Sequence, residues 1–317
     1  MTRIAPQTLT FTSDGTTCEA WHFAAEHDGL ATDAGRPVVV MAHGLGGTRD
    51  SGLEPFARGF AAAGLDVLLF DYRGFGGSGG SPRQTVSLEG QLTDYRAAMT
   101  AAAALPDVDP DRIVLWGVSL AGGHVLRAAA DRADVAAVVA LVPMVDGVAA
   151  AVHAKATHST SELLRATGRG IRGRVAARAG RGPVMIPVVA RPGEVGALTL
   201  PGALEDYLSI AGPTWRNEIA ADVALELGSR KPLAAAARVA CPLLVQIADF
   251  DQSAPPHAAA KAAFKGRAEV RHYPCDHFDV FEGKPWHGPA LTHAVSFLTR
   301  HLTPAAAPDA AREAVDA

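Results

Sequence analysis

The sequence predicts an α/β protein with a mostly parallel sheet and helices on both of its faces. Short, wholly apolar stretches alternate along the chain with longer helical patterns, and such stretches are typical of parallel strands that are buried on both sides. The chain has 317 residues, 48% of them hydrophobic, and a mean hydropathy of +0.11. It is therefore long enough for one large domain with a substantial core.

The expected elements begin with a hairpin, residues 9–13 and 18–23, around the turn dipeptide Asp14-Gly15. Further strands are expected at residues 37–42, 66–70, 113–116, 135–142, 242–248 and 268–273. Helices are expected at residues 52–64, 88–104, 257–264 and 289–302. Because parallel strands end at the same edge of a sheet, the loops that follow them should gather there and form the site.

The alternation stops between residues 146 and 230. No buried strand is clear in this stretch apart from residues 184–190, which Pro187 interrupts. We expect residues 146–230 to form a mainly helical cap over the edge of the sheet. Residues 1–145 and 231–302 would then form the core, with residues 303–317 as a flexible tail.

Arginines crowd the expected cap, and no acidic residue lies between Glu162 and Glu194. Such a charge run usually lies on a solvated face. The alternative is that it contacts an anionic part of a substrate or an acidic surface. The arginines concerned are Arg165, Arg169, Arg172, Arg174, Arg178 and Arg181.

Charge and cysteine content limit the class of function. The net charge of −4 argues against general nucleic-acid binding. Cys18, Cys241 and Cys275 form neither a disulfide framework nor a metal-binding pair, which fits a reducing, cytoplasmic location. We expect no signal peptide, no transmembrane segment, no cofactor and no metal site, and a homo-oligomer is compatible with the sequence.

The strongest chemical signal lies in residues 112–126. An apolar strand runs into Gly117, Ser119 follows, and small residues then open a helix. This arrangement is typical of a nucleophile elbow, in which a sharp turn exposes the serine hydroxyl beside a helix N-terminus. Ala121 departs from the usual G-x-S-x-G pattern, but it is also small. The alternative is an ordinary serine N-cap between a strand and a helix.

A nucleophilic serine needs a base that takes its proton and a carboxylate that orients the base. In α/β sheets these follow the serine in the chain, carboxylate first. The strand at 242–248 ends in Asp249-Phe250-Asp251, and the strand at 268–273 is followed by Asp276-His277. Candidates for both partners therefore stand at strand ends.

In combination, these motifs resemble the α/β-hydrolase superfamily, in particular members with a cap inserted after the sixth strand. The likeness covers residues 37–145 and 240–300. The matching motifs are His43-Gly44-Leu45-Gly46 for the oxyanion loop, residues 71–78 for the next loop, residues 117–122 for the elbow, Asp251 to Pro255 for the acid and His277-Phe278 for the base.

The resemblance implies a role for each matching residue. Ser119 would be the nucleophile, His277 the general base and then acid, and Asp251 the orienting carboxylate. Asp251 is preferred to its rival Asp249 because the acid of the family stands a few residues into the loop. Backbone N–H groups of Leu45 and Leu120 would form the oxyanion hole. Structural roles are expected for Asp276, His43 and His124.

We therefore expect a serine hydrolase that cleaves a carboxylic ester or thioester of a small-molecule acyl substrate through an acyl-enzyme. A peptidase, an amidase or an acyltransferase would use the same triad. A binding protein that uses the fold without catalysis belongs to another class, and the occupied triad positions argue against it.

Overall fold

The computed structural model describes residues 5–154, 160–228 and 231–304. Two antiparallel strands, β1 (Gln7–Ser13) and β2 (Thr16–Phe23), form one edge of an eight-stranded sheet. The parallel strands are β3 (Arg36–Ala42), β4 (Asp66–Phe70), β5 (Val108–Val118), β6 (Val135–Leu141), β9 (Leu243–Ala248) and β10 (Glu269–Tyr273). Their order is β1-β2-β4-β3-β5-β6-β9-β10, which confirms the mostly parallel sheet.

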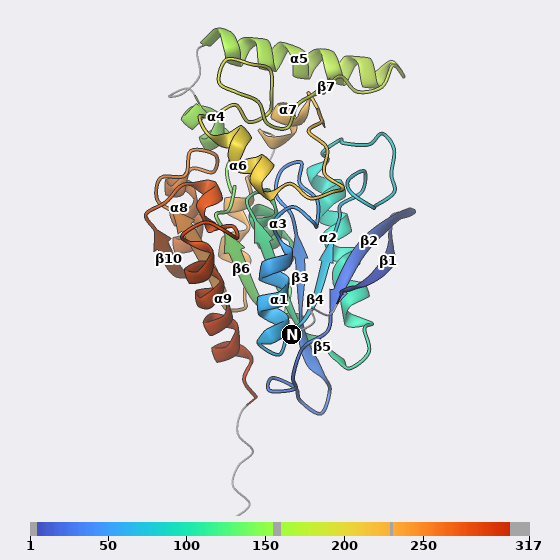
Figure 1. Cartoon of the computed structure of the whole chain (residues 1–317), viewed down its shortest axis with the longest axis vertical. Helices are drawn as coiled ribbons and strands as arrows, with labels where there is room; N and C mark the ends of the chain where they lie inside the picture. Colours follow the sequence, from blue (N-terminus) through green and yellow to red (C-terminus); the bar gives the residue numbers. More distant parts are fainter. Residues whose placement is uncertain (1–4, 155–159, 229–230, 305–317) are drawn as a thin grey trace, which may run out of the picture.

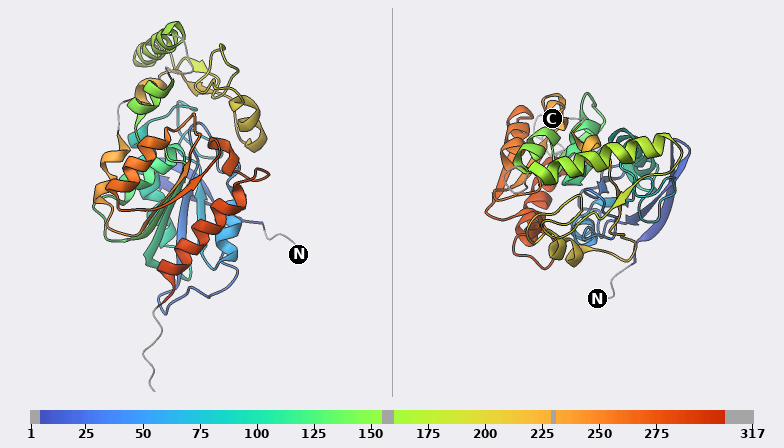
Figure 2. Two further views of the ribbon diagram at one scale, coloured as in Figure 1. Left: turned by 90° about the vertical axis from the view of Figure 1, so that its left-hand side faces the viewer. Right: turned by 90° about the horizontal axis from the view of Figure 1, so that it is seen from above.

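Helices cover both faces of the sheet, as Figure 2 shows. One face carries α1 (Glu54–Ala62) and α9 (His287–Leu302), and the other carries α2 (Leu88–Ala103), α3 (Leu120–Ala129) and α8 (Pro256–Lys265). The central strands are apolar because neither face meets water. Residues 38–42 of β3, for example, are fully buried.

Strand β5 is longer than the sequence pattern predicts, because it begins at Val108 rather than near Ile113. The added residues include exposed Pro110 and Asp111, which lie outside the buried part of the sheet. The register with β3 shifts in this region, between Arg36 and Val38. Hydrophobic patterning reports burial, so it detected only the covered half of the strand.

The segment between β6 and β9, residues 146–230, is called here the inserted segment. It lies beyond the carboxyl ends of the strands, at the top of Figure 1. Its described elements are α4 (Gly147–Ala154), α5 (Thr160–Arg178), β7 (Met185–Ile186), α6 (Ala203–Ile210), β8 (Ile219–Ala220) and α7 (Val223–Leu227).

The middle of the inserted segment is less helical than predicted. Residues 179–202 contain turns and short extended pieces, and Val188 and Val189 within them are fully buried. Pro183, Pro187 and Pro192 lack the N–H that a helix needs, which accounts for the extended path. The extended chain is held through Asn217, whose side-chain amide donates to the carbonyl of Val189 and accepts from its N–H, both at 2.9 Å.

Burial raises the pKa of Cys18 and Cys275 to about 12, so these unpaired thiols stay protonated. Within the described ranges, no helix is both long and apolar enough to cross a membrane. The predicted flexible tail, residues 303–317, falls outside the described residues from position 305 onward.

Candidate active site

Ser119 occupies the sharp turn between β5 and α3. Its backbone has φ 57° and ψ −117°, a conformation that costs energy for any residue other than glycine and persists only where the surroundings impose it. Its N–H donates to the carbonyl of Leu141 and its carbonyl accepts from the N–H of Met144, both at 2.9 Å. Ser119 stands at the N-cap position of α3, but its side chain makes no capping hydrogen bond to the helix, so its hydroxyl does not serve as a cap.

Glycines allow three pieces of backbone to pass close to Ser119. A Cβ added to Gly117 would lie 2.3 Å from the carbonyl oxygen of Ala121, and one added to Gly122 would lie 2.7 Å from Pro143. A Cβ on Gly44 would lie 3.0 Å from the Cβ of Ser119. Ala121, the departure from the usual pattern, is accommodated fully buried.

The loop of residues 43–47 is held from the inserted segment. The hydroxyl of Tyr207 donates to the carbonyl of Leu45 at 2.8 Å, and the indole N–H of Trp215 donates to the carbonyl of Gly46 at 3.0 Å. The two rings stack with their centroids 5.1 Å apart. Neither residue was predicted from the sequence, because each follows its partner, by 162 and 169 positions, without a shared motif.

A buried ion-pair network supports the same loop from the core. The N–H of Arg49 donates to Oδ1 of Asp71 at 2.6 Å, and its guanidinium contacts both Asp71 and Glu19. Asp71 also accepts from the N–H of Gly77 at 3.0 Å. The network therefore links the loop after β3 to the glycine-rich loop after β4.

His43 and His124, which are expected to be structural, are both buried. Nδ1 of His43 lies 2.9 Å from the carbonyl of Gly44, and Nε2 of His124 lies 3.0 Å from the side-chain oxygen of Gln91. Burial lowers the pKa of His43 below its ordinary value and that of His124 to about 3. Both rings are therefore neutral at physiological pH.

His277 and Asp251 form a buried pair, with 5% and 3% of their surfaces exposed. Nδ1–H of His277 donates to Oδ2 of Asp251 at 2.6 Å. Oδ1 of Asp251 accepts the N–H groups of Ser253 at 2.8 Å and Ala254 at 2.6 Å. With Asp251 on Nδ1, the imidazole has its Nε2 left to accept a proton.

Burial alone would lower the pKa of His277, but the negative charge and hydrogen bond of Asp251 outweigh it. The charge of Asp276 acts in the same direction. The net pKa of His277 therefore lies above its ordinary value, because the imidazolium form is stabilised by a fixed carboxylate.

The two other aspartates near these strand ends have different partners. Asp249, the rival acid, lies 2.6 Å from Nδ1 of His272 at an exposed position. Asp276 caps the short 3₁₀ helix His277–Val280, where its Oδ1 accepts the N–H of His277 at 2.7 Å. Asp276 therefore orients the backbone that carries His277, as expected for a structural residue.

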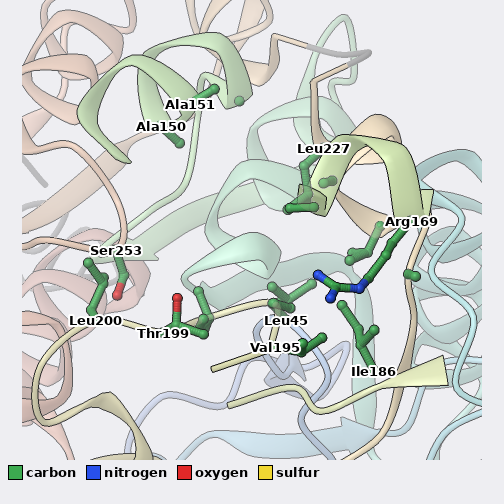
Figure 3. A pocket seen from close by; sticks show the side chains of 18 of the residues that line it. Leu45, Ala150, Ala151, Arg169, Ile186, Val195, Thr199, Leu200, Leu227 and Ser253 are labelled. Carbon is green, nitrogen blue, oxygen red and sulfur yellow. The ribbon is translucent and has the colours of Figure 1, made fainter. Parts of the chain in front are cut away.

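Ser119 and His277 line the same cavity, which has a volume of about 500 Å³ and lies beneath the inserted segment. A small cavity of about 40 Å³ adjoins both residues on the side of Phe278. Figure 3 shows the large cavity between the inserted segment and the sheet edge. Its apolar lining includes Leu45, Leu120, Met144, Ile186, Val195, Leu198, Leu200, Val223, Leu225 and Leu227.

Polar residues form a minority of the lining of the large cavity, as in most small-molecule sites. They include Arg165, Arg169, Thr167, Glu194, Thr199, Gln252 and Ser253. Over the portion of the chain with described positions, no three histidine, cysteine or acidic side chains are grouped so that they could hold a metal ion.

Comparison with known proteins identifies the family to which the chain belongs. A family model described as the alpha/beta hydrolase fold matches residues 37–170. Quorum-quenching protein AidA of Acinetobacter baumannii is 33% identical over 299 residues, which cover 93% of this chain and 95% of AidA. The chain belongs to the α/β-hydrolase family. Membership supports a hydrolase or an acyl-transfer activity for this α/β hydrolase.

Solved structures share the fold over nearly the whole chain. The α/β hydrolase GrgF from Penicillium sp. sh18 superposes with a TM-score of 0.77 at 24% identity, covering 94% of this chain and 99% of GrgF. The enol-lactonase from Burkholderia xenovorans LB400 has a TM-score of 0.59 at 19% identity, with 92% and 100% of the two chains covered. In sequence, thiohydrolase aneE of Aspergillus aculeatus is 38% identical over 114 residues, 36% of each chain.

Proposed function

We propose that this α/β hydrolase cleaves carboxylic esters or thioesters through an acyl-enzyme formed on Ser119, with the inserted segment acting as a cap. One observation carries the proposal. Ser119, in a strained elbow conformation, lines the same cavity as His277, whose Nδ1 is bonded to buried Asp251. A serine, a base and an orienting acid in this arrangement are the parts that acyl transfer requires.

In the proposed reaction, Oγ of Ser119 attacks the substrate carbonyl while Nε2 of His277 takes its proton. The resulting oxyanion accepts hydrogen bonds from the backbone N–H groups of Leu45 and Leu120, and each donor lowers the activation barrier by about 3–4 kcal/mol. The C–O or C–S bond then breaks, and His277 returns the proton to the departing alcohol or thiol. A water molecule repeats the sequence on the acyl-enzyme and releases the acid.

The names of relatives support acyl-group chemistry. They include thiohydrolase aneE, the polyketide transferase grgF of a Penicillium species and the quorum-quenching protein AidA. The similarity to polyketide transferases favours acyl transfer to another acceptor as the second candidate. A peptidase or amidase would use the same residues, whereas a non-catalytic binding protein would have no use for the strained serine.

The proposal is tested by labelling Ser119 with a fluorophosphonate probe and then assaying matched esters, thioesters and amides of one acyl group. Turnover of the ester and the thioester, with slower turnover of the amide, is the expected result. Added alcohol acceptors would reveal the second candidate by diverting acyl product from the acid to a new ester. An unlabelled protein without turnover would contradict the proposal.

The apolar cavity predicts a dependence on acyl length. For p-nitrophenyl esters, kcat/KM should rise by up to about fourfold for each added methylene, since burial of one contributes about 0.8 kcal/mol. The rise should end when the cavity of about 500 Å³ is filled. A flat series from acetate to decanoate would show that the acyl chain does not bind there.

The pKa of His277 predicts the acidic limb of the pH profile. As general base, His277 must be neutral in the free enzyme, so kcat/KM should fall as the pH drops through its pKa. Because that pKa is raised, the half-maximal point should lie above the ordinary value of 6.5. The profile of kcat/KM for a neutral ester measures it, and a midpoint below 6.5 would contradict the assignment.

The hydrogen bond from the indole N–H of Trp215 to the carbonyl of Gly46 predicts that Trp215 positions the loop of residues 43–47. Trp215→Phe should lower kcat about three- to tenfold with little change in KM, because a lost hydrogen bond of about 1 kcal/mol loosens the loop that carries Leu45. Trp286→Phe is the control, since Trp286 packs on Tyr273 instead. Equal kcat in the two variants would remove the positioning role of Trp215.

A cytoplasmic location and a homo-oligomer stay predictions from the sequence. The substrate proposed for this hydrolase is a small molecule. Neither a cofactor nor a metal ion enters the proposed reaction.

A further inference from the structure

The arginine run of α5 divides into residues with different surroundings. Arg174 lies 3.8 Å from Asp222 and 3.7 Å from Glu226, so it faces the acids of the α7 region. Arg172 is exposed and does not line the cavity, whereas Arg165 and Arg169 do. The solvated-face interpretation therefore fits the exposed Arg172, whereas Arg165 lines the cavity at an exposed position and Arg169 lines it half-buried.

Arg169 projects into the cavity. Figure 3 shows its side chain reaching from α5 toward the middle of the cavity, on the side where Leu45, Ile186 and Val195 also project. Helix α5 is closely packed at the residue next to Arg169. A Cβ added to the neighbouring Gly170 would lie 3.1 Å from the carbonyl oxygen of Ala221, so glycine lets α5 approach the chain before α7.

The Arg169 guanidinium has no protein counter-ion among the residues for which the structure gives side chains. The acid in the cavity lining is Glu194, and its carboxylate accepts the backbone N–H of Arg191 at 2.9 Å. Arg165 adds a second positive charge, but it is exposed. A half-buried cation among apolar side chains is unfavourable when it is left unpaired, and an anion on a ligand would offset that cost.

We propose that the substrate carries a carboxylate or equivalent anion, several bonds from the scissile carbonyl, which the guanidinium of Arg169 binds under the inserted segment. This inference rests on the proposed function, because it names the substrate class of the same cavity. Two parallel N–H···O bonds from a planar guanidinium match a carboxylate well, and the apolar walls match the chain that joins the anion to the carbonyl.

The anion can belong to the acyl group or to the leaving group, and two substrate series separate these sources. The first uses p-nitrophenyl monoesters of linear dicarboxylic acids against their ω-carboxamide counterparts. The second uses hexanoyl esters of 4-hydroxybenzoate against those of 4-hydroxybenzamide. Wild type, Arg169→Gln and the control Arg172→Gln are compared by the ratio of kcat/KM between charged and neutral members of each pair.

In one of the two series, and at the best chain length if that is the dicarboxylate series, wild type and Arg172→Gln should show a kcat/KM about tenfold higher for the charged member. The difference should lie mostly in KM, as a charge-assisted hydrogen bond implies. The preference should disappear in Arg169→Gln and weaken with added salt. The series that shows it identifies the source of the anion. A charged-to-neutral ratio near one in both series, or a ratio that Arg169→Gln leaves intact, would overturn the inference.

A readout without turnover separates this inference from the proposed function. Free adipate should raise the melting temperature of wild type more than adipamide does, and Arg169→Gln should abolish the difference. If the probe does not label Ser119 in the wild type but adipate still raises its melting temperature, only the serine mechanism is contradicted. Labelling and ester turnover without any adipate effect or charge preference would count against the anion site alone.

Discussion

Ser119→Ala is expected to abolish fluorophosphonate labelling and to lower kcat for ester hydrolysis by about 10⁴-fold or more. The substitution removes the atom that forms the acyl-enzyme, and the remaining hydrogen-bond donors can only assist attack by water. Because the Ser119 side chain does not cap α3, the change removes no helix-capping bond. The melting temperature should therefore shift by only a few degrees at most.

The matched control is Ser209→Ala on α6. The hydroxyl of Ser209 donates to the carbonyl of Asp206 at 2.6 Å at an exposed position. Mass spectrometry of labelled peptides should locate the probe on Ser119 in the wild type and in this control. Labelling of another residue that persists in Ser119→Ala would refute Ser119 as the nucleophile.

Asp251→Asn is expected to lower kcat by about 10⁴-fold, whereas Asp249→Asn should change it only a few-fold. Both aspartates lie 2.6 Å from Nδ1 of a histidine, but the Asp251 pair is buried and its His277 lines the cavity, whereas the Asp249 pair is exposed. An amide in place of Asp251 would no longer stabilise the imidazolium or hold the tautomer with Nε2 free.

The pH profile gives an independent readout of the same substitution. The charge and hydrogen bond of Asp251 raise the pKa of His277 against the effect of burial. Asp251→Asn removes the opposing contribution, so the acidic limb of the residual kcat/KM should move to lower pH. Circular dichroism of both variants confirms that each is folded. A larger loss of kcat in Asp249→Asn would transfer the orienting role to Asp249.

The sequence alone predicted the alternating core and the points at which chemistry-bearing residues leave it. Buried parallel strands are apolar throughout, so β3, β4, β6 and β9 were located to within about a residue. The strand ends share one edge, which is why motifs around Leu45, Ser119 and His277 could be expected to meet although they lie far apart in the chain. Residue order left Asp249 and Asp251 both open, and the resemblance to the family favoured Asp251, which the structure pairs with His277.

Long-range polar contacts could not be predicted from any sequence pattern. The bonds from Tyr207 and Trp215 to the loop at Leu45 and Gly46 join a segment without clear periodicity to one in the core. A hydroxyl or indole N–H can satisfy any nearby carbonyl, so the residue type alone does not identify its partner. Only the fold of the inserted segment decided which carbonyls these were.

For the arginines of α5, too, the sequence determined one part of the outcome and the tertiary structure decided the rest. Helical periodicity determines which of them share a face, but it does not say which face meets a cavity, an acidic neighbour or water. Gly170 lets α5 approach the chain at Ala221, and in the resulting fold Arg169 projects into the cavity whereas Arg172 is exposed and does not line it. The sequence thus determined that positive charge would lie in this segment, and packing decided which charge faces the cavity.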